Sequence, residues 1–264
     1  MVKASGINRI KEENLKALAG LRWQWRGYAM AGIVFYAVGF LFLAREWKIE
    51  YAWRWLGLSL IVFGYILRTV WLNLGENRRE GEEHLLPGLG AGNLVSLMRG
   101  ALIAALYGFL FAPLPEGRIA WLPGLLYTVA ILSDYVDGAL ARLTDHVTQL
   151  GKVLDMYFDG LGMLVVTALL VQYGKVPAWY LLIGLARYLF LFGMCLRERL
   201  GKVNHPLPVS VRRRGMAALQ MGFVAVVLLP IFSPPGTHVI AYAFGFPLLV
   251  GFLFAREGLA SCLR

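Results

Sequence analysis

Long apolar runs, separated by short polar turns, fill most of this chain. Eight of these runs are long enough to cross a bilayer as helices, since a spanning helix takes about 20 apolar residues. They cover residues 27–44, 55–74, 93–113, 119–141, 153–173, 178–196, 211–231 and 237–255. The pattern predicts an all-α, polytopic membrane protein of about eight spans.

Polar stretches divide these runs into four parts. A basic N-terminal segment, residues 1–26, precedes the first two runs in residues 27–74, which we expect to form a transmembrane hairpin. Residues 75–92, GENRREGEEHLLPGLGAG, combine dense charge with Gly and Pro, a composition typical of loops, and predict a cytoplasmic linker. Residues 93–264 hold the remaining six runs and predict a six-helix domain.

The N-terminal segment has an apolar face at helical spacing. The face carries Ile7, Ile10, Leu18, Leu21 and Trp25. Two interpretations stay open. The segment forms an amphipathic helix lying on the membrane, or it is a frayed basic tail that only supplies positive charge.

Composition supports a membrane protein. Hydrophobic residues make up 58% of the chain and charged residues 16%, whereas a soluble domain has about 25% charged residues. The net charge of +10 would suggest nucleic acid in a soluble protein, but basic and aromatic residues do not interleave as in single-strand binders. We expect the basic residues to meet anionic lipid and predict no nucleic-acid partner. Two cysteines form neither a disulfide framework nor a metal motif.

Four carboxylates lie near the ends of two adjacent apolar runs. Asp134 and Asp137 are three residues apart, and Asp155 and Asp159 are four apart, so each pair shares one face of a helix. Asp145 falls in the polar turn between the pairs, where we expect it to be solvated. Uncompensated carboxylates are costly at membrane depth and indicate a functional site.

Carboxylates that converge in a poorly hydrated site repel one another and need cations. Two hard divalent ions, Mg²⁺ or Mn²⁺, suit such oxygen ligands. Paired ions stabilise the attacking and leaving oxygens in phosphoryl transfer. A di-iron site would need Glu-x-x-His pairs, which this chain lacks. The acids therefore predict a metal-dependent site with two ions.

Basic residues predict the orientation in the membrane. Residues 1–26 contain six Lys and Arg, and residues 197–214 contain another six, whereas the outer turns of the last six runs contain only Arg118 and Lys175. We therefore expect both termini and the acidic cluster on the cytoplasmic side. The membrane is then the plasma membrane of a prokaryote.

The acids belong to a longer motif of fixed spacing, D-x2-D-G-x2-A-R-x8-G-x3-D-x3-D. It is filled by Asp134, Asp137, Gly138, Ala141, Arg142, Gly151, Asp155 and Asp159. The motif resembles the signature of the CDP-alcohol phosphotransferases, membrane enzymes that make phospholipids, and every signature position matches. The resemblance implies a six-helix core, to which residues 27–74 are an addition, and a homodimer. Because residues 27–74 hold no acidic cluster, we predict no catalytic role for them.

The resemblance also implies a reaction. A hydroxyl of an alcohol attacks the β-phosphorus of a CDP-linked lipid, usually CDP-diacylglycerol, and CMP leaves. Asp134, Asp137 and Asp155 would hold the metal ions, with Asp159 as a further ligand and as the general base. The expected CDP-binding residues are Gly138, Ala141, Arg142 and Gly151, together with Asn93 and Ser96, which resemble the family's first core helix. Arg99 belongs to the same resemblance; the alternative for this stretch is a helix cap at Asn93 and an interfacial arginine at Arg99.

The sequence gives less information on which alcohol accepts the phosphatidyl group. Arg212, Arg213 and Arg214 begin an apolar run and would suit an acceptor that carries a phosphate. The stretch faintly resembles the Gly-Lys-x-Lys-Thr-x-x-Gln region of phosphatidylglycerophosphate synthases, with Gln220 in place but Met216 for the second Lys. Glycerol 3-phosphate and an inositol phosphate both stay open.

Two other classes compete with a transferase. A transporter or ion pathway could use intramembrane carboxylates for coupling, but transport gives no reason for the Asp-Gly-x2-Ala-Arg spacing. An inactive structural relative would have had no need to keep the whole signature. Simple helix packing could explain the small residues, and the positive-inside rule could explain the arginines.

Overall fold

The computed structural model describes residues 2–200 and 211–253, and every regular element in these ranges is a helix. The α-helices are α1 (Val2–Glu46), α2 (Ile49–Asn73), α3 (Gly90–Tyr107), α4 (Leu122–Leu143), α5 (Gln149–Gln172), α6 (Leu181–Arg199), α7 (Val211–Leu228) and α8 (Gly236–Leu253). Short 3₁₀ helices are η1 (Leu74–Glu76), η2 (Gly117–Trp121) and η3 (Ala178–Tyr180). The predicted all-α class is confirmed.

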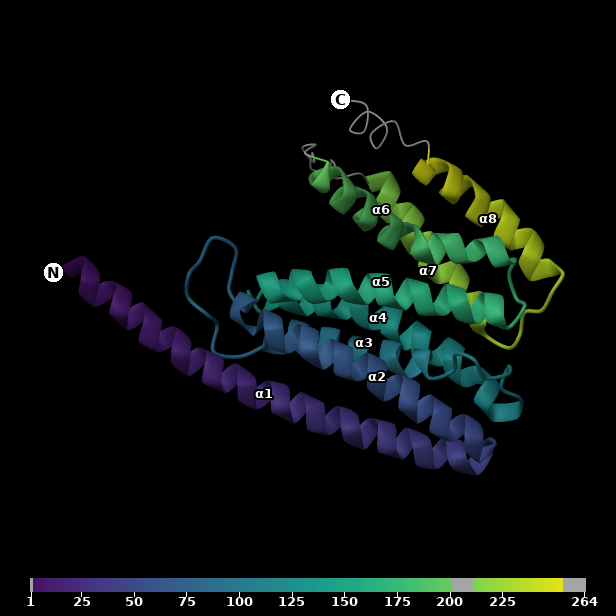
Figure 1. The fold of residues 1–264 in the computed structure, drawn as a ribbon, viewed down its shortest axis with the longest axis horizontal. Coiled ribbons are helices and arrows are strands. Elements are labelled where there is room, and N and C mark those ends of the chain that lie inside the picture. The colour runs from purple at the N-terminus through teal and green to yellow at the C-terminus, as the bar shows by residue number, and fades with distance from the viewer. Residues whose placement is uncertain (1, 201–210, 254–264) are drawn as a thin grey trace. The chain divides into compact units, whose positions relative to one another are not determined.

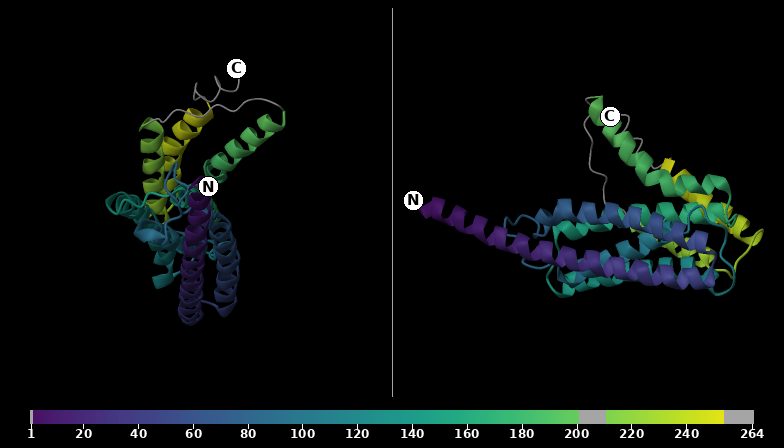
Figure 2. Two further views of the ribbon diagram at one scale, coloured as in Figure 1. Left: turned by 90° about the vertical axis from the view of Figure 1, so that its left-hand side faces the viewer. Right: turned by 60° about the horizontal axis from the view of Figure 1, so that its bottom comes forward.

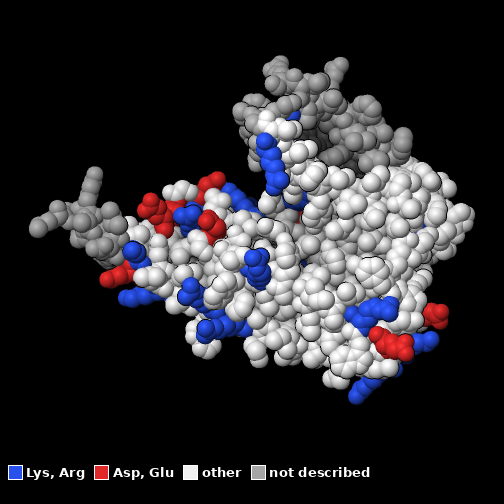
Figure 3. Space-filling model, in the orientation of Figure 1, with Lys and Arg blue, Asp and Glu red and all other residues white. Residues whose placement is uncertain are grey.

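Six stretches of the described chain are long and apolar enough to cross a membrane. They are Ile10–Glu46, Ile49–Glu76, Gly90–Tyr107, Gly117–Leu143, Gln149–Gln172 and Ala178–Arg197. On α1 and α2, charged side chains gather toward the helix ends and leave the middle almost uncharged (Figure 3). The chain is therefore a polytopic membrane protein. The apolar stretch described in α7, Gly215–Leu228, is shorter, and the total of eight spans stays a prediction.

The chain divides into two compact units. The first comprises Met1–Pro115 with Leu125–Asp159, and the second comprises Glu116–Gly124 with Gly160–Arg264. The first unit thus contains α1, α2, α3, most of α4 and the start of α5. The hairpin, the linker and all four signature carboxylates lie together in this unit.

The hairpin of α1 and α2 is held by aromatic rings packed on glycines. The two helices run side by side and antiparallel (Figures 1 and 2). An ideal Cβ on Gly32 would lie 2.1 Å from the Phe63 ring, and one on Gly39 would lie 2.5 Å from the Trp55 ring. Tyr36 stacks edge-on against Phe63, with ring centroids 5.1 Å apart. A side chain at either glycine would force the helices apart.

The N-terminal segment is part of α1 and not a separate helix. Leu21 on its predicted apolar face is fully buried. Trp25 on the same face donates a hydrogen bond from Nε1 to the carbonyl of Leu67 in α2, at 2.9 Å. The segment is therefore helical and not frayed, and Trp25 packs against α2; its lying on the membrane stays a prediction.

The linker is an ordered loop that returns along α1 to the start of α3. We call its residues 75–89 the strap. The side-chain amide of Asn14 in α1 donates to the Glu83 carbonyl at 2.9 Å and accepts from the Leu85 amide at 2.8 Å. In Figure 1 the strap is the blue loop between α2 and α3. These bonds satisfy backbone groups of a loop that has almost no regular structure.

Two tyrosines of α1 attach the hairpin to α3. The hydroxyl of Tyr28 donates to the Leu97 carbonyl, and that of Tyr36 donates to the Ala101 carbonyl, each at 2.8 Å. Buried tyrosines generally need such a partner for the hydroxyl. The hairpin therefore orients α3, the helix that carries part of the predicted site.

In the second unit, α6 packs closely on the end of α5. Gly184 of α6 lies against Thr167, where an ideal Cβ would be 2.0 Å from the threonine hydroxyl. Gln220 of α7 is buried and donates a hydrogen bond to the hydroxyl of Tyr180. This glutamine, the best match to the phosphatidylglycerophosphate synthase pattern, is therefore engaged in packing within the unit.

Candidate active site

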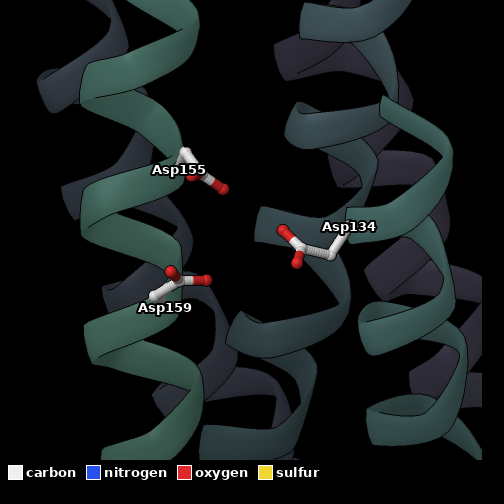
Figure 4. Close-up of side chains that lie close together, drawn as sticks. All are labelled: Asp134, Asp155 and Asp159. Atoms are coloured by element: carbon white, nitrogen blue, oxygen red, sulfur yellow. The ribbon is translucent and has the colours of Figure 1, made fainter. Parts of the chain in front are cut away.

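Three of the four signature carboxylates converge between α4 and α5. Asp134 projects from α4 toward Asp155 and Asp159 on the facing side of α5 (Figure 4). Each offers one oxygen, and these oxygens all lie within 4.8 Å of one another. The four-residue spacing on α5 stacks Asp155 one turn from Asp159. The short turn from α4 to α5 then brings Asp134 opposite them.

Asp137 lies outside this group. It sits on α4 three residues after Asp134, but it is buried, 7% exposed, and faces α3. Its Oδ2 accepts a hydrogen bond of 2.6 Å from the hydroxyl of Ser96. The predicted set of four is thus divided in this structure into a cluster of three and one buried acid beside it.

Arg99 of α3 pairs with all three acids of the cluster, a role that the sequence analysis did not assign to it. Its side chain is 3% exposed. The guanidinium pairs with Asp134, with Asp155 at 2.7 Å and with Asp159 at 3.6 Å. A signal for this role was present, because Arg99 continues the every-third-residue row of the two residues predicted to bind CDP on α3.

The donor set fits hard divalent cations. The four carboxylates bring four negative charges, and the Arg99 guanidinium offsets one of them. Groups of like charge at this separation are stable together only with further positive charge. Carboxylate oxygens are the ligands that Mg²⁺ and Mn²⁺ prefer. The cluster of Asp134, Asp155 and Asp159 could therefore hold such an ion.

A cavity of about 530 Å³ opens beside the carboxylates. It is lined by Gly92, Asn93, Ser96, Asp134, Asp137, Gly138, Ala141, Arg142, His146, Val147, Thr148, Gly151, Lys152 and Asp155. All six residues predicted to bind CDP are among them. The structure thus gathers residues from α3, α4, α5 and the α4–α5 turn around one hollow.

Small residues shape this cavity. An ideal Cβ on Gly92 would lie 2.9 Å from the Ala141 Cβ, so α3 and α4 approach closely there. One on Gly151 would lie 2.7 Å from Oδ1 of Asn93. One on Gly138 would reach the Arg142 guanidinium at 3.3 Å. A larger residue at any of these positions would therefore press on a neighbouring residue of the cavity wall.

Asn93 belongs to a buried hydrogen-bond network behind the cavity wall. Its Nδ2 donates to Asn77 Oδ1 at 3.2 Å and to Thr148 Oγ1 at 3.0 Å. The Thr148 hydroxyl oxygen also accepts from the Gly151 amide at 3.0 Å, as an N-cap of α5 does. Asn93 itself lies inside the first turn of α3 and links the two helix starts.

His146, in the α4–α5 turn, is a residue that the sequence analysis missed. It lines the cavity, and its Nε2 lies 3.0 Å from the carbonyl oxygen of Gly88 in the strap. A lone histidine without spaced partners gives no sequence signal. The neighbouring Asp145 is exposed, as expected, but it also pairs with Arg79 of the strap at 2.6 Å.

The predicted acceptor site lies outside the described side chains. Arg212, Arg213 and Arg214 fall in the first turn of α7, and the structure describes only their helical backbone. Their proposed role stays a prediction.

The comparisons with known proteins agree with the motif. A profile of the family described as CDP-alcohol phosphatidyltransferase matches residues 90–251. Two relatives are named CDP-diacylglycerol–glycerol-3-phosphate 3-phosphatidyltransferase. That of Bacillus subtilis is 33% identical over 114 residues, which are 39% of this chain and 59% of the relative. That of Rickettsia bellii is 31% identical over 148 residues, 56% of this chain and 78% of the relative.

A third relative, from Mycobacterium bovis, is named putative cardiolipin synthase. It is 31% identical over 164 residues, 62% of this chain and 75% of the relative. No solved structure matches the chain. The family match begins at the first residue of α3, so the hairpin and the strap lie before it.

Proposed function

Because this chain belongs to the CDP-alcohol phosphatidyltransferase family, we propose that it transfers a phosphatidyl group from CDP-diacylglycerol to a hydroxyl of a small alcohol and releases CMP. The observation that carries the proposal is the convergence of Asp134, Asp155 and Asp159 beside a cavity lined by the rest of the signature. A three-carboxylate cluster next to a nucleotide-sized hollow suits phosphoryl transfer, where positioning and charge supply most of the rate.

Asp134, Asp155 and Asp159, joined by Asp137, would hold Mg²⁺ or Mn²⁺, two ions in all. When bound, such ions offset the charge of the diphosphate and of the attacking and leaving oxygens. Arg99 holds the carboxylates in place through its ion pairs with three of them.

Asp159 is the general base. Its carboxylate accepts the proton of the acceptor hydroxyl as the hydroxyl oxygen bonds to the β-phosphorus. The bond from that phosphorus to the CMP oxygen breaks, and CMP leaves with the electron pair. The side chain of Asp159 is 34% exposed, which leaves it open to an incoming alcohol.

The CDP group lies in the cavity against Asn93, Ser96, Gly138, Ala141 and Gly151. Small side chains let the nucleotide approach the helix backbone. The exposed guanidinium of Arg142 lies at the cavity wall and offsets phosphate charge.

The acceptor carries a phosphate of its own, which Arg212, Arg213 and Arg214 bind. Glycerol 3-phosphate is the first choice, because it stands in the names of two relatives. An inositol phosphate is the second.

The enzyme works at the cytoplasmic face of a prokaryotic plasma membrane, with both termini on that side. The excess of Lys and Arg in the inner segments supports this orientation. The working form is a homodimer, as the family resemblance implies.

The test is CMP release by the purified protein with CDP-diacylglycerol and Mg²⁺, with glycerol 3-phosphate, inositol phosphate, inositol and serine added one at a time. We expect release with a phosphate-bearing alcohol. Asp159→Asn should lower the rate by a factor of about 100 to 10,000, the usual contribution of a general base.

Asp145→Asn is the matched control, because this side chain is 87% exposed and lies outside the carboxylate cluster. It should keep nearly full activity. Equal rates for the two variants would remove Asp159 from the mechanism. Ion flux that depends on substrate, without CMP release, would favour a transporter.

A further inference from the structure

The strap lies wholly before the family match, yet it contacts the residues that line the cavity. The match begins at residue 90, and the strap covers residues 75–89. Its polar side chains and carbonyls meet the start of α3, the α4–α5 turn and the first turn of α5. These contacts connect an addition to the family fold with the site that the family shares.

Asn77 is the centre of the strap. It is fully buried. Its Nδ2 donates to the carbonyls of Leu86 and Gly88 at 3.1 Å and 2.8 Å. Its own carbonyl accepts from the Leu86 amide at 2.8 Å. One asparagine thus closes the strap into a loop and satisfies backbone groups that would otherwise be buried without partners.

The side-chain oxygen of Asn77 bonds to a residue of the cavity wall. Its Oδ1 accepts a hydrogen bond from Nδ2 of Asn93, which lines the cavity. The same Nδ2 also donates to Thr148 at the start of α5. These two hydrogen bonds use both amide protons of Asn93, and its Oδ1 faces Gly151. An ideal Cβ on Gly151 would lie 2.7 Å from this oxygen. Asn77 therefore helps set the rotamer of Asn93.

Other strap contacts are more exposed and individually weaker. Lys152 at the cavity pairs with Glu80, and Arg79 pairs with Asp145. Exposed ion pairs of this kind contribute little to stability, because solvent screens them. The backbone amide of Gln149 also donates to the Arg78 carbonyl at 2.9 Å. The buried Asn77 to Asn93 bond is the contact with the most influence on the cavity, because a buried polar group left without a partner is costly.

We infer that Asn77 is a positioning residue for nucleotide binding, which acts through Asn93 and so makes the N-terminal addition part of the working site. The inference rests on the proposed function, since it assumes that the cavity takes the cytidine diphosphate group. Asn77 does not touch the reacting atoms. Its loss should therefore weaken binding of CDP-diacylglycerol and leave the chemical step nearly unchanged.

The experiment compares full-length Asn77→Ala with Asn73→Ala, the same change four residues earlier. The Asn73 side chain donates only within α2, to the Thr69 carbonyl at 2.8 Å. Initial rates of CMP release are measured over a range of CDP-diacylglycerol concentrations. We expect Asn77→Ala to raise KM about five- to tenfold, the effect of losing the one buried hydrogen bond that reaches Asn93, with kcat changed less than about twofold. Asn73→Ala should change neither.

A double-mutant cycle with Asn93→Ala separates positioning from general destabilisation. If Asn77 acts through Asn93, the effect of Asn77→Ala on KM disappears once Asn93 is alanine. Additive effects of the two changes would overturn the inference, and so would equal KM values for Asn77→Ala and Asn73→Ala. Should Asn77→Ala yield no folded protein, Asn77→Ser keeps a hydroxyl for the strap carbonyls and is expected to raise KM in the same way.

Equilibrium binding of CDP in the presence of Mg²⁺ distinguishes this inference from the proposed function. If the wild-type protein releases no CMP with any alcohol, the proposed reaction fails. Weaker CDP binding by Asn77→Ala than by Asn73→Ala would then still support the positioning role. Absence of CDP binding by the wild-type protein would overturn both.

Discussion

The guanidinium of Arg99 lies among carboxylates that would otherwise repel one another. Asp134, Asp155 and Asp159 all pair with it, and it is almost fully buried. Opposite charges at such distances stabilise the ionised forms of both partners. A single buried cation therefore allows a cluster of acids to persist in an apolar helical unit. Because charge remains uncompensated, the same cluster retains affinity for a divalent ion.

We predict that Arg99→Gln makes stability depend more strongly on Mg²⁺. Without the guanidinium the carboxylates repel one another, and a bound ion stabilises the folded protein by mass action. The melting temperature of the variant should fall in chelator and rise more than that of the wild type when Mg²⁺ is added. The control is Arg68→Gln, the same change at an exposed arginine of α2. A Mg²⁺ response that is equal in Arg99→Gln and the wild type would contradict the prediction.

The structure also explains why residue 151 is a glycine. We predict that Gly151→Ala lowers the rate of CMP release at limiting CDP-diacylglycerol about tenfold or more. The added Cβ would lie 2.7 Å from Oδ1 of Asn93, which cannot move away because two hydrogen bonds hold its amide. Overpacking of this kind costs about 1–3 kcal/mol.

The matched control for this change is Gly64→Ala in α2. An ideal Cβ there meets nothing within 4 Å, and alanine favours a helix by up to about 1 kcal/mol over glycine. The control should therefore keep full activity and lose no thermal stability. Similar rates for the two variants would show that space at Gly151 is not needed.

At the scale of elements, the helices differ from the apolar runs mainly at their polar ends. The run predicted at 153–173 corresponds to α5, which begins at Gln149, four residues before the apolar stretch, because Thr148 caps the helix there. The run at 93–113 corresponds to α3, Gly90–Tyr107. Hydropathy locates the part of a helix that meets lipid, whereas the backbone hydrogen bonds decide where the helix ends. The carboxylates of the proposed site lie in the halves of α4 and α5 that adjoin the turn between these helices.

The strap and the first turn of α5 are joined by an exposed ion pair, Glu80 with Lys152, and the sign of its pH dependence can be worked out. The hydrogen bond from the Lys152 ammonium lowers the pKa of the Glu80 carboxyl below its ordinary value of 4.5. A group with a lowered pKa contributes stability above the ordinary pKa and loses it as the pH falls through the lowered one.

We therefore predict that the wild type and Glu80→Gln differ slightly at neutral pH and converge as the pH falls well below 4.5. Melting temperatures measured across this range check the prediction. The difference should be small, because both side chains are largely exposed, and CMP release at pH 7 should change by less than about twofold. A difference that grows with acidification would contradict the assignment.

At the scale of the whole molecule, the N-terminal hairpin is structurally continuous with the site. It lies in the same compact unit as the four carboxylates, and Tyr28 and Tyr36 attach it to α3. Among the described residues the cluster is made of Asp134, Asp155 and Asp159, none of them in the hairpin, and the absence of a catalytic role for the hairpin stays a prediction. The hairpin orients α3 and leads directly into the strap.

Several features followed from the sequence alone. A segment that crosses a bilayer must satisfy its own backbone hydrogen bonds, and an α-helix does so within a single apolar run. The pattern of apolar runs therefore determined the all-α membrane class. The signature determined the family and the part of the chain in which the acids lie. Its residues fall within 26 positions, and their spacing does not depend on how the other helices are arranged. Both are local properties of the chain.

Only the tertiary structure decided which side chains meet. Asp134 faces the acids of α5 whereas Asp137 turns to Ser96, although both acids sit on one helix three residues apart. The partnership of Arg99 with the acids, and that of Asn77 with its neighbour on α3, join residues far apart in sequence. Hydropathy and spacing carry no information on such pairs, because they depend on how closely α3, α4, α5 and the strap approach one another.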